Sequence, residues 1–132
     1  MTIGLSTALR SARAQLLIDE LNNGAIRFYD SPRPVTGAAI ATQVLLATCD
    51  LFSPAGTVSD GVITLNVVDQ SAQTTVAADV HWVRLVDSSG AFVADMSCGI
   101  LGSGAEIVYD DVSIAIGSNL RILSGTILEG NA

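Results

Sequence analysis

Few residues of this chain have the types and spacing that catalysis needs. His81 is the only histidine, so a catalytic triad or a histidine-bound metal would depend on it alone. No Gly-x-Ser-x-Gly turn, which would expose a serine nucleophile, occurs in the 132 residues. Asp110 and Asp111 are adjacent, but neighbouring residues of a strand point to opposite faces and cannot share one reaction. The sequence therefore predicts no catalytic residue and a protein that is not an enzyme.

Ligands for a metal or a cofactor are equally sparse. Cys49 and Cys98 lack the spacing of a zinc site, and no Asp-x-Asp-x-Asp-Gly calcium loop is present. Calcium at scattered loop carboxylates remains the alternative. The run 102–104, Gly-Ser-Gly, resembles part of a phosphate loop, but the chain has no lysine to complete one. We expect no metal and no cofactor, and two buried cysteines whose bonding to each other stays open.

Aromatic side chains offer a different chemistry, the stacking of sugar rings. The candidates are Tyr29, Trp82 and Tyr109, although aromatic residues make up only 5% of the chain. Trp82 shares the strand phase of the apolar Val76 and Val80, which favours a position in the core. A saccharide site would therefore depend on Tyr29 and the loops near it.

Composition restricts the class of partner. The net charge is −7, and the six arginines are scattered with no lysine among them, which argues against nucleic-acid binding. Hydrophobic residues reach 49% while charged residues are only 14%, so part of the surface is expected to be buried in an assembly. No secretory signal or membrane span is visible, and we expect a protein made in the cytoplasm that binds other proteins.

The N-terminal segment has the pattern of a helix over about residues 6–22. Ser6 or Thr7 can cap it, and apolar residues recur at roughly helical spacing as far as Leu21. Asn22-Asn23-Gly24 tolerates the left-handed backbone that ends a helix. Such a helix has one apolar stripe, which must pack on its own domain or on a neighbouring subunit.

From Ala25 onward the apolar period changes to two, which indicates strands. Sets of alternating apolar residues are separated by turn-forming runs such as 53–56 (Ser-Pro-Ala-Gly), 59–61 (Ser-Asp-Gly) and 87–90 (Asp-Ser-Ser-Gly). The spacing predicts a mainly β fold: an antiparallel β-sandwich or barrel of about 7–8 strands over residues 25–129, with the one N-terminal helix. No linker or repeat divides the chain, so residues 1–132 are expected to form a single domain.

One segment interrupts the strand pattern, an extended loop or arm over residues 31–43. Pro32 and Pro34 cannot donate to a β-ladder, so this segment is expected to stay outside its own sheet and lie on a partner. The residues predicted to contact that partner are Arg27, Tyr29, Pro32, Arg33 and Pro34.

Several segments together resemble small structural proteins of tailed bacteriophages and prophages. The opening helix, the strand that leads into the arm and an aromatic-x-Arg-x-x-Asp-x-x-Gly hairpin are similar to segments of that family, as is the closing strand. These segments are 5–13, 26–37, 45–48, 82–90 and 126–131. The family usually has apolar residues where Cys49 and Cys98 stand.

The resemblance implies a virion protein, first of all a head decoration (cement) protein. Such a protein would bind the major capsid protein on the outside of the head and also itself, as a homo-oligomer for which a trimer is one candidate. It would stabilise the head without contacting nucleic acid or membrane. The alternative implied by the family is a tail or tail-fibre component that binds host-surface saccharide, and a small hydrolase is the weakest option.

Overall fold

The computed structural model describes residues 4–30, 32–67, 71–73, 78–100, 107–109, 113–114 and 119–128, and side chains within 4–30, 32–67, 80–98 and at Ile107. The fold is mainly β with one helix, as predicted. The elements are α1 (Thr7–Leu21), β1 (Ala25–Tyr29), β2 (Leu45–Ser59), β3 (Val62–Val67), β4 (Ser71–Gln73), β5 (Ala78–Asp79), β6 (Trp82–Val86), β7 (Phe92–Ile100), β8 (Ile107–Tyr109), β9 (Ser113–Ile114) and β10 (Asn119–Leu128).

Helix α1 confirms the expectation for residues 6–22. The Ser6 side chain accepts a hydrogen bond from the backbone N–H of Leu9 (3.2 Å), which satisfies one of the free donors of the first turn. The helix ends at Leu21, where Gly24 N–H returns to the Leu21 carbonyl (2.8 Å) and Asn23 adopts a positive φ of 59°. One side of the helix packs into the core through Ala14, Ile18 and Leu21.

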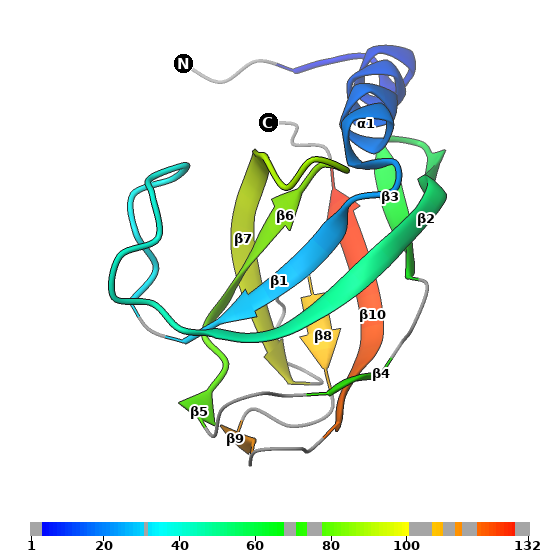
Figure 1. The fold of residues 1–132 in the computed structure, drawn as a ribbon. Helices are drawn as coiled ribbons and strands as arrows, with labels where there is room; N and C mark the ends of the chain where they lie inside the picture. The colour runs from blue at the N-terminus through cyan, green and yellow to red at the C-terminus, as the bar shows by residue number, and fades with distance from the viewer. Residues whose placement is uncertain are drawn as a thin grey trace.

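The main sheet is curled around the core (Figure 1). Five neighbouring strands, in the order β3-β2-β1-β6-β7, are antiparallel to one another. The pairing continues from β7 to β8, then to β10, and β10 also pairs with β3. One pair departs from the antiparallel expectation, because β7 and β8 run parallel. Short strands β5 and β9 form a separate two-stranded pair.

Strand β2 corrects one predicted turn. The run 53–56 was expected to end a strand, but β2 continues through it, and the pairing with β3 shifts register between Leu51 and Gly56. Partners outside the ladder hold this irregular stretch: Ala55 N–H donates to the Asn22 side chain (2.8 Å), and the Asn66 amide donates to the Pro54 carbonyl (3.3 Å). A bulge satisfied in this way bends a strand without ending it. The turns at 59–61 and 87–90 are present as expected.

The core occupies the inside of the curled sheet and is made of alternate strand residues, as the period of two predicts. Its fully buried members include Ile26, Phe28, Val83 and Leu85. Leu45, at the start of β2, is exposed, because the β1–β2 register shifts by one residue there. The run 102–104 and Asp110-Asp111 lie outside the described residues.

Candidate protein-interaction surface

Strands β1 and β6 are covered on both faces, and together with β7 they carry aromatic and charged side chains on the face turned away from the core. We call this the outer face. The register places Tyr29 opposite Trp82 and Arg84 opposite Asp95. The Tyr29 and Trp82 rings stack with centroids 4.8 Å apart, and the indole N–H donates to the Asp30 carbonyl (2.8 Å). Trp82 is therefore buried as predicted, but outside the main core cluster.

A bidentate ion pair lies beside these rings. Arg84 Nε is 2.7 Å from Asp95 Oδ1, and Arg84 Nη2 is 2.9 Å from Oδ2. The Asp95 side chain is 0% exposed. The guanidinium carbon of Arg84 lies 5.3 Å from the Trp82 ring centroid and 5.1 Å from that of Phe92, within the range of cation–π attraction. Two rings and one carboxylate thus fix the arginine.

Asp95 also fastens the arm to the outer face. The backbone N–H of Gly37 donates to Asp95 Oδ2 (3.0 Å), and Arg33 Nη2 donates to the Asp95 carbonyl (3.0 Å). At the base of the arm, Val44 N–H donates to Asp30 Oδ1 (2.7 Å) and Asp30 N–H to the Val44 carbonyl (3.3 Å). The arm is outside the strands, as predicted, but it is closed at its base and bound to its own sheet instead of extended.

The charge of Asp95 is stabilised by these contacts. Burial alone would raise the pKa of its carboxyl, but the hydrogen bonds from Arg84 and Gly37 and the positive charges of Arg84 and Arg33 outweigh burial and lower it. Among the described residues, no buried side-chain nitrogen or oxygen lacks a hydrogen-bond partner. The anchor of the arm is therefore a fully paired polar cluster that stays ionised at neutral pH.

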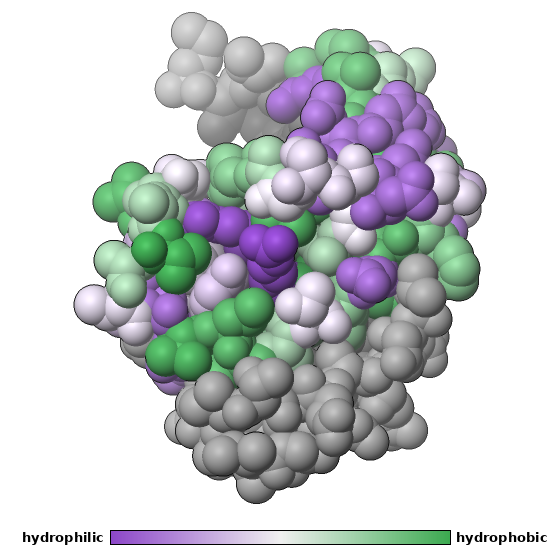
Figure 2. All heavy atoms as spheres, viewed as in Figure 1, coloured by the Kyte–Doolittle hydropathy of each residue, from purple (hydrophilic) through white to green (hydrophobic). Residues whose placement is uncertain are grey.

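The fixed arm and its surroundings expose apolar side chains. Val35, at the turn of the arm, is 83% exposed. We call the group formed by the exposed apolar residues in and beside the arm the arm surface; its members are Val35, Ile40, Val44, Leu45 and Phe92. Figure 2 shows apolar side chains gathered over this end of the molecule, next to strongly hydrophilic ones near the centre of the view. Exposed apolar groups on a fixed support are typical of protein-interaction sites.

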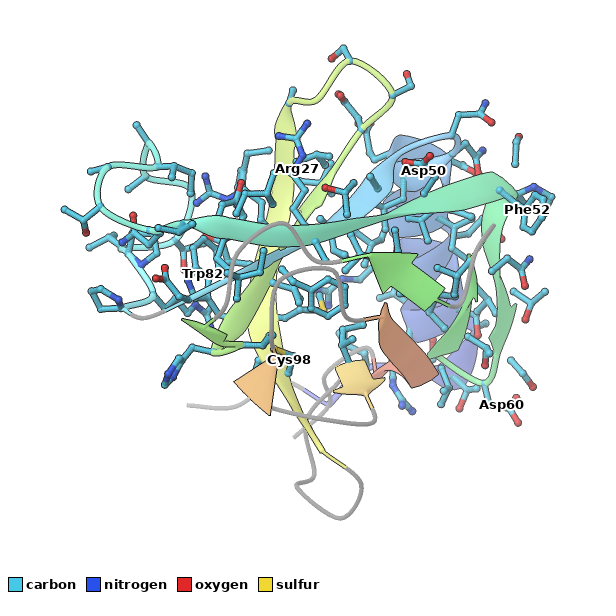
Figure 3. All side chains as sticks on the ribbon, turned by 60° about the horizontal axis from the view of Figure 1, so that its bottom comes forward. Arg27, Asp50, Phe52, Asp60, Trp82 and Cys98 are labelled. Atoms are coloured by element: carbon cyan, nitrogen blue, oxygen red, sulfur yellow. The ribbon has the colours of Figure 1, made fainter. Side chains whose placement is uncertain are left out.

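The five predicted contact residues occupy different environments. Pro32 and Arg33 are exposed and Pro34 is half-buried, all on the arm. Arg27 is half-buried on the outer face and reaches toward the β6–β7 hairpin, where a side chain added at Gly90 would meet its guanidinium (Figure 3). Tyr29 is only 4% exposed, because it stacks on Trp82, so little of its ring is left for a partner or a sugar.

The sequence analysis missed the Arg84–Asp95 pair and its hold on the arm. Counting outward from the Asp87–Ala91 turn would place Arg84 opposite Ala94. A register shift between Leu85 and Val86 moves Asp95 into that position instead. A β-bulge of this kind leaves no clear mark in the residue pattern, so the pairing depended on the folded hairpin.

The remaining candidates for chemistry are placed as follows. His81 is exposed and precedes β6, and its backbone N–H donates to the Tyr29 carbonyl (2.9 Å). Cys49 is buried and Cys98 is half-buried against the core, and neither forms a disulfide. Within the described residues, no three His, Cys, Asp or Glu side chains gather as a metal site would require, and no helix there has the length and apolarity of a membrane span.

Comparison with family models, with curated proteins and with solved structures gives no match to this chain.

Proposed function

We propose that this chain is a structural protein of a tailed-phage virion that decorates the outside of the head. The observation that carries the proposal is the arm surface, an exposed apolar group held in place by a buried ion pair. A loop fixed before binding loses less conformational entropy when a partner covers it, so such a surface is suited to protein recognition. The resemblance of the chain to phage structural proteins supports the choice of partner, the major capsid protein.

The proposed action is non-covalent. Sites formed between capsid subunits when the head expands would receive the decoration protein, and binding to the expanded lattice alone would stabilise that state by mass action. A protein with equal affinity for both lattice states would stabilise neither relative to the other. Arg27 and Arg33, which lie on and next to the arm, are the side chains proposed to pair with capsid carboxylates.

Co-sedimentation of the purified chain with expanded heads, unexpanded proheads and isolated tails tests this proposal. We expect binding to expanded heads and little to proheads. Replacing both Arg27 and Arg33 by Ala should weaken binding more than the single Arg121→Ala change in β10. Binding to tails alone would overturn head decoration and favour the tail component.

The saccharide-binding alternative has less support than the sequence alone gave it. It relied on Tyr29 as an exposed aromatic, and that ring is buried against Trp82. A glycan array is its direct test: specific binding of a host-surface saccharide would restore this alternative.

We also propose that the curled sheet forms a closed barrel of about seven strands. The double pairing of β10, with β8 on one side and β3 on the other, supports closure. Closure removes sheet edges that would otherwise pair with other chains. Amide hydrogen exchange tests closure. In a closed barrel the β10 amides that point toward β8 and those that point toward β3 should both exchange slowly, whereas in an open sheet the amides on the unpaired side of β10 should exchange fast.

A further inference from the structure

Two exposed apolar surfaces lie at opposite ends of β1. Helix α1 precedes Ala25 and the arm follows Tyr29, so the two surfaces are separated by the length of this strand (Figure 1). Five strand residues span roughly 17 Å at about 3.3 Å per residue. The arm is held on the outer face by Asp95, so it cannot turn back to cover the helix of its own chain.

The exposed side of α1 carries its own apolar stripe. Leu9, Ala12 and Leu16 follow the i, i+3, i+7 spacing of one helix face, and all three are exposed. Leu16 is 66% and Leu9 47% exposed. We call these three residues the helix stripe. They are separate from the buried residues of α1, which are Ala14, Ile18 and Leu21.

The charged residues next to the helix stripe have an unfavourable orientation relative to the helix dipole. Asp19 and Glu20 occupy the last turn, where no basic residue accompanies them, and Arg10 and Arg13 lie nearer the N-terminus. Carboxylates at a helix C-terminus meet its partial negative charge, which is unfavourable. Asp19 accepts a hydrogen bond from the Gln15 amide (3.0 Å), a neutral donor that leaves its negative charge in place. A cation from outside the chain would relieve this arrangement.

The arm is complementary to the helix stripe in charge, because its one charged residue is a cation. Residues 32–43 contain one charged side chain, Arg33, and no acidic residue. Arg33 is exposed and uses one donor on the Asp95 carbonyl, and a guanidinium carries five. An apolar arm surface with a cation therefore matches an apolar helix stripe with two carboxylates.

We propose that the arm surface of one copy docks on the helix stripe of a second copy, head to tail. Val35 and its apolar neighbours would cover Leu9 and Leu16, and Arg33 would pair with Asp19 or Glu20. Because the two surfaces are different parts of the chain, the docked pair still has one free arm surface and one free helix stripe. Further copies can add in the same way, and they form a ring where the rotation between copies closes and an open filament where it does not. The proposal concerns self-association and goes beyond head binding. An arm surface that is docked on a second copy is not free for a capsid, so the two uses of this surface compete.

Mass measurement by light scattering, on the protein without heads, tests the proposal with two blocking variants. Val35→Asp disables the arm surface and Leu16→Asp disables the helix stripe, at positions so exposed that the fold should tolerate both. The wild type should have a mass of at least twice 13.6 kDa, whereas each variant alone should fall to the mass of a single chain. Thr57→Asp, which adds the same charge at an exposed position of β2, is the matched control and should stay oligomeric.

Mixing the two variants is the decisive step. Each supplies the surface that the other lacks, so the mixture should form a dimer of twice the single-chain mass and nothing larger. A Glu20→Arg, Arg33→Glu double variant should assemble better than either single change. A monomeric wild type, an oligomeric Leu16→Asp, or a mixture that stays monomeric would each overturn the proposal. Failure to bind heads would leave these masses unchanged and would count against the decoration function only.

Discussion

The two faces of β1 and β6 are both shielded from water, but by different chemistry. The inner face carries Phe28, Val83 and Leu85, which pack against the rest of the curled sheet and α1. The outer face carries the stacked rings, Arg84 and Asp95, and its cover is a single loop, the arm. The contribution of the inner face to stability should depend on the volume that its side chains fill. The contribution of the outer face should depend on whether each polar group keeps its hydrogen-bond or ion-pair partner.

The largest effect is expected from emptying the inner face. Phe28 is fully buried, and Phe28→Ala should lower the free energy of unfolding by about 4 kcal/mol through lost burial and the cavity left behind. Denaturant unfolding measures the change. Phe52→Ala, at a half-exposed phenylalanine of β2, is the matched control and should cost far less. Equal losses would mean that Phe28 does not fill the core.

Breaking the ion pair should come next on the outer face. Asp95→Leu leaves the buried Arg84 charge without its partner and should lower the free energy of unfolding by roughly 3 kcal/mol. This value is near the lower end for buried pairs because only one loop covers this pair. The double change Arg84→Met with Asp95→Leu should recover most of that loss, since it removes both charges. Hydrogen exchange of the Gly37 amide should be faster in both variants, because both lack the Asp95 carboxylate that accepts its hydrogen bond. A double variant as unstable as the single one would contradict a role based on charge.

Acid should weaken the outer face more than the inner face. The pKa of Asp95 is lower in the folded chain than its unfolded value near 3.9. Its stabilisation is therefore complete above that unfolded value and is lost as the pH falls through the folded pKa. Denaturant midpoints of the wild type should fall on acidification more steeply than those of the Arg84→Met, Asp95→Leu variant. Parallel curves would show that Asp95 does not titrate in this way.

The smallest of these effects concerns the backbone of the arm. Gly37 has a φ of +79°, and a side chain there would lie 3.2 Å from the Phe92 ring, so Gly37→Ala should cost about 1 kcal/mol. Gly4→Ala is the control, because an added carbon there meets nothing within 4 Å. Thermal unfolding of the two variants compares them directly; a Gly37→Ala variant as stable as the Gly4→Ala variant would mean that the arm is not held as described.

The residue pattern by itself determined the parts of this protein that depend on local chemistry. A capping serine and helical spacing determined α1, alternation determined which residues of β1 and β3 face the core, and the prolines kept the arm out of the sheet. Each of these features is a property of a few consecutive residues, so it can be predicted without knowing the partner of a strand.

Only the tertiary structure decided how the outer face is assembled. Arg84 meets Asp95 because a one-residue shift in the β6–β7 pairing brings them opposite, and the arm is fixed because Gly37, 58 residues earlier in the chain, reaches the same carboxylate. The run 53–56 stays within β2 because Asn22, from the end of α1, supplies a hydrogen bond. Register and long-range partners are properties of the pairing and not of either segment, and a shift of one residue exchanges the side chains that meet.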